Sequence, residues 1–204
     1  MRSRFYHSVI LKVSALTHKF VQRPRIFLYK LLSTCPRVEG KGSLVQPVLF
    51  LGSGRIVIGK RVTLGCRPSP YLYSGYIHLE ARKPQSLILI GDRCWVNNNC
   101  AFISEGGGIE IGADTIIGTN VEIYDSDFHE LDPSKRMTGI PKTASVKIGT
   151  NVFIGSNVRI LKGVSIGDNT VIANGSIVVS SIPKDVTAGG NPAKILRSLK
   201  DSLS

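Results

Sequence analysis

The sequence is poor in the features that usually mark metal sites, disulfide frameworks and membrane spans. It has four cysteines, none in a CxxC pair, and no cluster of histidines beside them, which argues against a zinc site. The cysteines form no disulfide framework, so a reducing, cytoplasmic compartment is expected. No stretch approaches the roughly 20 apolar residues that a spanning helix needs. Lys12 and Lys19 would also interrupt the apolar region of a secretory signal.

What the sequence has in quantity is aliphatic residues at a step of six. The step runs without a slip through Ile148, Ile154, Ile160, Ile166, Ile172 and Val178. Shorter runs come before it, at Ile90, Val96 and Phe102, and at Ile111, Ile117 and Ile123. Glycine usually follows the aliphatic residue, Asn or Asp crowds the next places, and a small or β-branched residue comes four places after it.

This hexad pattern predicts an all-β solenoid. Strand side chains alternate, so the aliphatic residue and the residue two places before it point to the same side. The remaining positions form a corner, where Gly, Asn and Asp tolerate left-handed backbone. Three strands and three corners close one triangular turn, and stacked turns bury a continuous apolar column. Ordinary β-hairpins are the alternative, but they would not keep the step in phase over so many units.

One long insertion interrupts the solenoid, which we assign to residues 42–186. After Ile123 the next aliphatic residue is due at position 129 but comes at Ile148, so residues 129–147 are expected to form an external loop. His129 lies at the mouth of this loop. It is a candidate functional residue, and a histidine that only caps a turn is the simpler alternative.

Residues 1–41 are predicted to form a basic amphipathic helical extension. They hold nine Lys or Arg and one acid, which gives +8 of the chain's net +12. Apolar residues fall on one helical stripe at Phe5, Val9, Val13, Leu16 and Phe20. Pro24 is expected to break this helix. The helix either covers the open end of the solenoid or lies peripherally on an anionic membrane, and no nucleic-acid-binding motif accompanies its charge.

Residues 187–204 are predicted to form a tail with a turn and a short helix. The stretch "GGNPAKILR" begins with the turn and continues into the helix, which would bring Lys194, Arg197 and Lys200 close together. Such a cluster is either a solvated basic cap or a binding site for a phosphorylated ligand.

The hexads, the loop histidine and the tail "IPKDVTAGGNPAKILR" together resemble the left-handed β-helix, hexapeptide-repeat acyltransferases. Over residues 87–200 the chain is most similar to the galactoside, maltose and nodulation-factor O-acetyltransferases and to polysaccharide-cluster acetyltransferases. The resemblance implies a left-handed coil, a homotrimer with an active site between neighbouring coils, and acetyl-CoA as co-substrate without a metal. It also implies a saccharide acceptor, such as a surface-polysaccharide or lipid-linked precursor.

The resemblance also assigns candidate site residues. His129 matches the family's general base. The acceptor-binding residues would be Asn97, Glu105 and Asp127, although "SEGGG" around Glu105 departs from the family pattern. The acetyl-CoA-binding residues would be Gly155, Ser156, Ala173, Asn174, Lys194 and Arg197. Asp127, Glu130 or a backbone carbonyl could orient the His129 ring.

A histidine suits this chemistry because a sugar hydroxyl attacks a thioester more easily if its proton is removed as the bond forms. The unperturbed imidazole pKa of about 6.5 allows that exchange at neutral pH. Two rival hypotheses stay open. The protein could acetylate the amine of a nucleotide-linked amino sugar, or it could be a non-catalytic trimeric scaffold. The expected location is cytoplasmic, with the surface of the inner membrane as an alternative within it.

Overall fold

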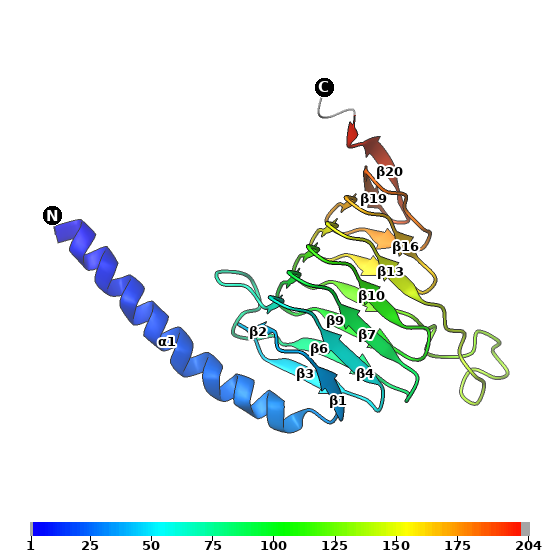
Figure 1. Cartoon of the computed structure of the whole chain (residues 1–204), viewed down its shortest axis with the longest axis horizontal. Coiled ribbons are helices and arrows are strands. Elements are labelled where there is room, and N and C mark those ends of the chain that lie inside the picture. Colours follow the sequence, from blue (N-terminus) through cyan, green and yellow to red (C-terminus); the bar gives the residue numbers. More distant parts are fainter. Residues whose placement is uncertain (1, 201–204) are drawn as a thin grey trace.

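The computed structural model describes residues 2–200, with side chains from Val9 onward. A long helix, α1 (Arg2–Leu32), leaves one end of a stack of β-coils, and the C-terminus lies at the other end (Figure 1). From β1 to β18, each of three sheets takes every third strand along the chain, so the backbone winds around a three-sided column. The predicted stack of parallel coils is therefore present.

The three sheets are called A, B and C. Sheet A contains β1 (Arg37–Glu39), β4 (Arg55–Ile58), β7 (Leu87–Ile90), β10 (Ile109–Ile111), β13 (Val146–Ile148) and β16 (Ser165–Ile166). Sheet B contains β2 (Ser43–Leu44), β5 (Thr63–Leu64), β8 (Trp95–Val96), β11 (Ile116–Ile117), β14 (Phe153–Ile154), β17 (Val171–Ile172), β19 (Val186–Gly190) and β20 (Ala193–Ser198). Sheet C contains β3 (Val48–Leu51), β6 (Ile77–Ala81), β9 (Ala101–Ser104), β12 (Glu122–Tyr124), β15 (Arg159–Ile160) and β18 (Ile177–Val178).

The hexads form the core as predicted. Neighbouring strands are parallel, and equivalent hexad residues lie in register, as Ile117 does with Ile154. The aliphatic residues at the step of six are all buried. The residues four places after them are buried too, among them Val152, Val158 and Thr170, except where an insertion follows Phe102 or Ile123. Each hexad thus contributes two inward side chains, and the coils bury one continuous apolar column.

The corners depend on Asn and Asp for one reason and on glycine for another. Asn120 and Asn157, three places after their hexad residues, have φ angles of 56° and 59°, in the left-handed region that Asn tolerates. The two side chains also stack, because Asn120 Nδ2 donates to Asn157 Oδ1 at 2.9 Å. The glycine after the hexad residue is needed for close approach instead. A Cβ at Gly112 would lie 2.5 Å from the carbonyl of Gly149 in the next coil.

The helix does not end at Pro24, so that prediction was wrong. Pro24 lies inside α1 and is exposed to solvent, where the carbonyl that loses its partner can meet water. The helix is held on both sides of the proline. Gln22 Nε2 donates to the carbonyl of Leu72 at 2.5 Å, and Arg25 Nη2 donates to the carbonyl of Gly75 at 2.8 Å. The side chain of Phe5 lies outside the described side chains.

The short C-terminal helix was also predicted wrongly. Residues Ala193–Ser198 form β20, which pairs antiparallel with β19 at the edge of sheet B. Gly190, with a φ of 105°, begins the turn between the two strands. Pairing with β20 covers the edge that β19 would otherwise expose, and this tertiary gain outweighs the helix propensity of "AKILR". Residues 201–204 of the predicted tail lie outside the described residues.

Candidate functional site

The long loop leaves the coil at the corner between sheets C and A. It joins β12 to β13 and so comprises residues 125–145, because residues 146 and 147 already belong to β13. The stretch "EGGG" occupies the same corner one coil earlier, between β9 and β10. The loop and the shorter insertion therefore stack on one another.

A single buried carboxylate ties these two insertions together. Asp125 follows β12 and is fully buried. Its Oδ2 accepts hydrogen bonds from Ser104 Oγ and Gly108 N, both at 2.6 Å, and its Oδ1 accepts one from Glu105 N at 2.7 Å. Its backbone carbonyl accepts from the N–H of Ala144 at 2.9 Å, at the far end of the loop. Asp125 thus joins both ends of the loop to the coil before it.

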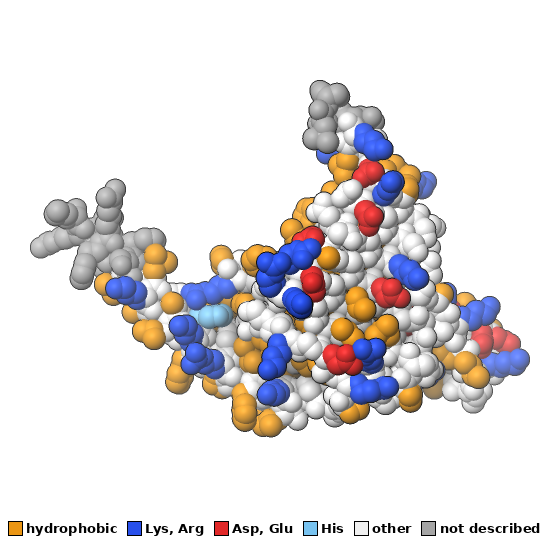
Figure 2. All heavy atoms as spheres, in the orientation of Figure 1, with side chains coloured by type: hydrophobic (Ala, Val, Ile, Leu, Met, Phe, Trp, Pro, Cys, Tyr) orange, Lys and Arg blue, Asp and Glu red, His pale blue; other side chains and the backbone are white. Residues whose placement is uncertain are grey.

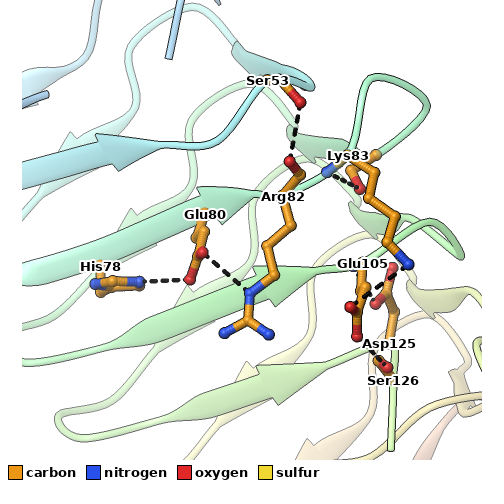
Figure 3. A network of polar contacts seen from close by, with 9 residues as sticks. Ser53, His78, Glu80, Arg82, Lys83, Glu105, Asp125 and Ser126 are labelled. Atoms are coloured by element: carbon orange, nitrogen blue, oxygen red, sulfur yellow. Dashed lines mark hydrogen bonds and ion pairs between the residues drawn. The ribbon is translucent and has the colours of Figure 1, made fainter. Parts of the chain in front are cut away.

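Glu105 belongs to the same polar network, shown in Figure 3. Its Oε2 accepts a hydrogen bond from Ser126 Oγ at 2.7 Å, and Lys83 Nζ lies 3.5 Å from its Oε1. The structure therefore brings this predicted acceptor-binding residue to the base of the loop that carries His129. Its carboxylate is partnered there by the chain's own side chains.

The residue before His129 is held in an unusual conformation. Phe128 has a φ of 61°, which a bulky residue adopts only where its surroundings impose it. Its ring packs edge-on against Tyr124, with 5.4 Å between ring centroids, and the Arg82 guanidinium lies 4.7 Å from the ring centroid. Its N–H donates to Ser126 Oγ at 2.9 Å. These contacts fix the direction in which the chain enters His129.

Arg82 is in turn held by sheet C. Its Nε donates to Glu80 Oε1 at 3.0 Å, and His78 Nε2 lies 3.1 Å from Glu80 Oε2, as Figure 3 shows. Burial by itself would raise the pKa of Glu80, but the hydrogen bonds from His78 and Arg82 outweigh it and lower that pKa. Glu80 is therefore an ionised link between the coil and the ring of Phe128.

His129 itself is exposed on the loop, and its Nδ1 lies 3.3 Å from the backbone carbonyl of Arg136. Of the three groups that could orient the ring, the carbonyl is the one in contact. Asp127 instead pairs with Lys162, at 2.9 Å, and Glu130 binds backbone N–H groups of the loop. A carbonyl can only accept, so a hydrogen bond here requires the proton of the ring to be on Nδ1.

Asp127 has one oxygen still without a partner. Its Oδ1 pairs with Lys162, but its Oδ2 is buried and has no hydrogen-bond partner among the described residues. A buried carboxylate oxygen without a donor is costly. Because the oxygen is buried, it is closed to a ligand while the loop keeps this conformation.

A second cluster of predicted site residues lies in a groove on sheet B, on another side of the column. The groove is lined by Cys66, Trp95, Asn97, Ile116, Ile117, Gly118, Phe153, Gly155, Ser156 and Asn174. It brings together the predicted acceptor-binding Asn97 and three predicted acetyl-CoA-binding residues, Gly155, Ser156 and Asn174. Its apolar wall is unusually exposed, because Trp95, Ile116 and Phe153 each leave about half of their surface in solvent.

The polar side chains of this groove are largely engaged with the backbone. Asn174 Oδ1 accepts from the N–H of Ser156 at 2.8 Å, and Ser156 Oγ accepts from the N–H of Thr119 at 3.1 Å. Asn97 Oδ1 accepts from the N–H of Asn98 at 2.7 Å. Ala173 continues the same corner, and its N–H donates to the carbonyl of Ala188 at 2.8 Å. The groove is thus rigidly built.

Lys194 and Arg197 lie on β20, in the same sheet as the groove. Residues three apart on a strand normally point to opposite faces, but β20 is irregular opposite Thr187 and Ala188. Arg197 pairs with Thr187 and Lys194 pairs with Gly189, so both share one face. Thr187 lies in register with Val171, and Val171 with Phe153. One outward row therefore runs from Trp95 to Arg197, which we call the sheet B row.

Comparison with known proteins identifies the fold. Residues 145–180 match the bacterial transferase hexapeptide (six repeats) model. A hexapeptide-repeat acetyltransferase of Vibrio cholerae, solved with acetyl-CoA, is 30% identical, with a TM-score of 0.56 and 71% of each chain covered. The chain belongs to the hexapeptide-repeat transferase family. This confirms the family that the hexads indicated.

Other hexapeptide-repeat proteins are also similar. A galactoside acetyltransferase solved with coenzyme A is 25% identical, with a TM-score of 0.57, over 92% of this chain and 81% of that one. A curated Saccharomyces cerevisiae protein with a provisional acetyltransferase name is 43% identical over 121 residues, 58% of this chain and 61% of its own. The chain spans about three fifths of the length of the curated relatives it matches.

The structure of this hexapeptide-repeat transferase also contains residues that sequence reasoning missed. Asp125, Arg82 and Phe128 set the base of the loop, and Trp95 and Phe153 form the apolar wall of the groove. The single tryptophan stands directly before the hexad residue Val96, so its outward direction could have been read from strand alternation. Among residues 2–200, no group of three or more His, Cys, Asp or Glu side chains is placed to hold a metal ion.

Proposed function

We propose that this hexapeptide-repeat protein is an acetyl-CoA-dependent O-acetyltransferase acting on a sugar hydroxyl. The observation that carries the proposal is the sheet B row, which joins an apolar groove to two cations on one outward face. Five steps between neighbouring strands separate Trp95 from Arg197, about 24 Å at roughly 4.8 Å for each step. A long co-substrate with an apolar arm and an anionic end suits such a surface, and relatives have been solved with acetyl-CoA and coenzyme A.

In the proposed reaction, His129 acts as the general base. Its Nε2 takes the proton of the acceptor hydroxyl while the oxygen attacks the thioester carbonyl. The C–S bond then breaks, and the imidazolium returns the proton to the leaving thiolate, so that the products are an acetyl ester and CoA. The carbonyl of Arg136 holds the ring through Nδ1. Such a base contributes about 10²–10⁴-fold to the rate.

The complete site would need more than one chain. His129 lies at the corner between sheets C and A, whereas Asn97 and Ser156 follow strands of sheet B. In a homotrimer of left-handed coils, the loop of one subunit would lie against the sheet B row of its neighbour. The exposed Trp95, Ile116 and Phe153 supply apolar surface for that contact.

The direct test is CoA release from acetyl-CoA across a panel of saccharides and nucleotide-linked sugars. His129→Ala should lower acceptor-dependent release by about 10²–10⁴-fold. The matched control is His18→Ala, in α1 away from both clusters, which should leave the rate unchanged. Turnover with an amino sugar but not with its hydroxy analogue would favour N-acetylation. The absence of both turnover and acetyl-CoA binding would favour the scaffold.

A mixing experiment tests the shared site. His129→Ala and a groove variant, Ser156→Trp, should each be inactive as homo-oligomers. If each site uses the loop of one subunit and the groove of the next, reassembly of the two variants together should restore part of the activity. No restoration in mixed oligomers would contradict an active site between subunits.

A further inference from the structure

Helix α1 is joined to the coil through only one of its faces. His18, Gln22, Arg25 and Tyr29 recur at helical spacing and contact the segment between β5 and β6. The last turns border the open end of the coil, through Ile26 and Lys30. The rest of the helix extends away from the column (Figure 1). It therefore covers only part of the open end, which leaves the role of its outer face unexplained.

The outer face carries a continuous apolar stripe. Its members, 42 to 82% exposed, are Val9, Val13, Leu16, Phe20, Phe27 and Leu31. Their spacing places them on the side of the helix opposite Gln22 and Tyr29. Figure 2 shows hydrophobic side chains along the outer edge of the helix, with blue side chains beside them. We call this set the outer stripe.

A basic stripe borders the outer stripe on one side. Lys12, Lys19, Arg23 and Lys30 are exposed and lie four or seven residues apart, so they follow the same helical line. No acidic residue occurs in the sequence before Glu39. Two copies of the helix packed through the outer stripe would bring these cations together without any counter-charge, which disfavours a second copy as the occupant.

We propose that α1 docks the protein on an anionic lipid surface, with the outer stripe in the bilayer interface and the basic stripe against the headgroups. Apolar side chains on one face and cations beside them are the composition of interfacial helices. None of the helices in the described part of the chain is apolar enough to cross a membrane, so α1 lies along the surface. The proposal does not depend on the acetyl transfer proposed above.

The test is flotation of the full chain with vesicles of phosphatidylcholine alone or of equal parts phosphatidylcholine and phosphatidylglycerol. Leu16 and Leu11 make a matched pair. Both are exposed leucines, 69% and 56%, but they lie about 140° apart around the helix, and only Leu16 is in the outer stripe. Leu16→Gln should weaken binding to the mixed vesicles about tenfold, whereas Leu11→Gln should leave it close to wild type.

Charge is tested separately. Lys19→Gln should weaken binding to the anionic vesicles about fivefold, and Lys60→Gln, at an exposed corner of the coil, should not. Failure of the wild type to float with the mixed vesicles would overturn the proposal, as would equal loss in the two leucine variants. A smaller oligomer in Leu16→Gln, measured by sedimentation, would make the outer stripe a subunit contact and would also overturn it.

Discussion

The buried carboxylate of Asp125 offers a test of how the loop is held. In Asp125→Ala, Ser104 Oγ, Glu105 N and Gly108 N all lose their acceptor. A buried donor without a partner costs about 1–3 kcal/mol, so with three such donors the variant should lose about 3–9 kcal/mol of unfolding free energy. Asp125→Asn keeps one oxygen. If the amide oxygen takes the place of Oδ2, the hydrogen bonds from Ser104 and Gly108 remain. The loss of unfolding free energy should then be about 1–3 kcal/mol.

The assay is urea unfolding followed by circular dichroism at one fixed protein concentration, because association would change the apparent stability. The matched control is Asp132→Ala. Asp132 lies in the same loop and accepts two hydrogen bonds from Ser134, but it is exposed, so its loss should cost far less than the loss of Asp125.

The prediction is an order of effects: the loss of unfolding free energy should be largest in Asp125→Ala, smaller in Asp125→Asn and smallest in Asp132→Ala. If Asp125→Ala were within about 1 kcal/mol of wild type, the network would not hold the loop and the reasoning would be wrong. In the enzyme assay, Asp125→Asn should lower kcat while leaving KM for acetyl-CoA unchanged. The reason is that the loop carries the proposed base, whereas the sheet B row is proposed to bind the co-substrate.

Two further predictions concern the column itself. Gly112→Ala places a Cβ 2.5 Å from the backbone of Gly149, so it should lower the urea midpoint strongly; an unchanged midpoint would show that the coils can separate at that corner. The pKa of Glu80 is lowered in the folded state. Its contribution to stability is therefore present above its usual pKa of 4.5 and is lost as pH falls through the lower folded value. Acid titration of Glu80→Gln should show a shallower loss of stability than the wild type, and equal slopes would contradict the role of the His78 and Arg82 contacts.

The column was predictable because its signal is repeated and local. Each hexad from Ile148 to Val178 must place two side chains inward, and no tertiary contact outside the stack can change that requirement. Upstream, where the step of six is lost, the stretches "YIHLE" and "SLILI" still alternate or run apolar, and they lie in β6 and β7.

The predictions for the two ends of the chain were wrong where a long-range contact decides the structure. Pro24 is a helix breaker by local rules, but Gln22 and Arg25 bind a segment about 50 residues away and hold the helix across it. The sequence "AKILR" favours a helix, but β19 offers it an unpaired edge. Neither partner could be identified from the segments themselves.

The site was predictable in its parts but not in its arrangement. His129 became a candidate because the count breaks there, whereas Ser156 became one only through the resemblance to the family. Asp125 could not be identified from the sequence, because its role depends on the hydrogen bonds that it accepts from Ser104 and Gly108, in the coil before it. The alignment of Lys194 with Arg197 depends on an irregular pairing between β19 and β20, which leaves no mark on the spacing.

The regular spacing of the coils has a consequence for how such proteins can change in length. The loop leaves the column after β12, and two more strands of sheet C, β15 and β18, follow before the β19–β20 hairpin. Each strand adds about 4.8 Å, so the distance from the loop to the cations of β20 can change only in whole steps. Duplication or loss of one coil would keep every inward contact while lengthening or shortening that distance. The column would therefore act as a fixed-increment spacer, able to match co-substrates of different length without redesign of its core.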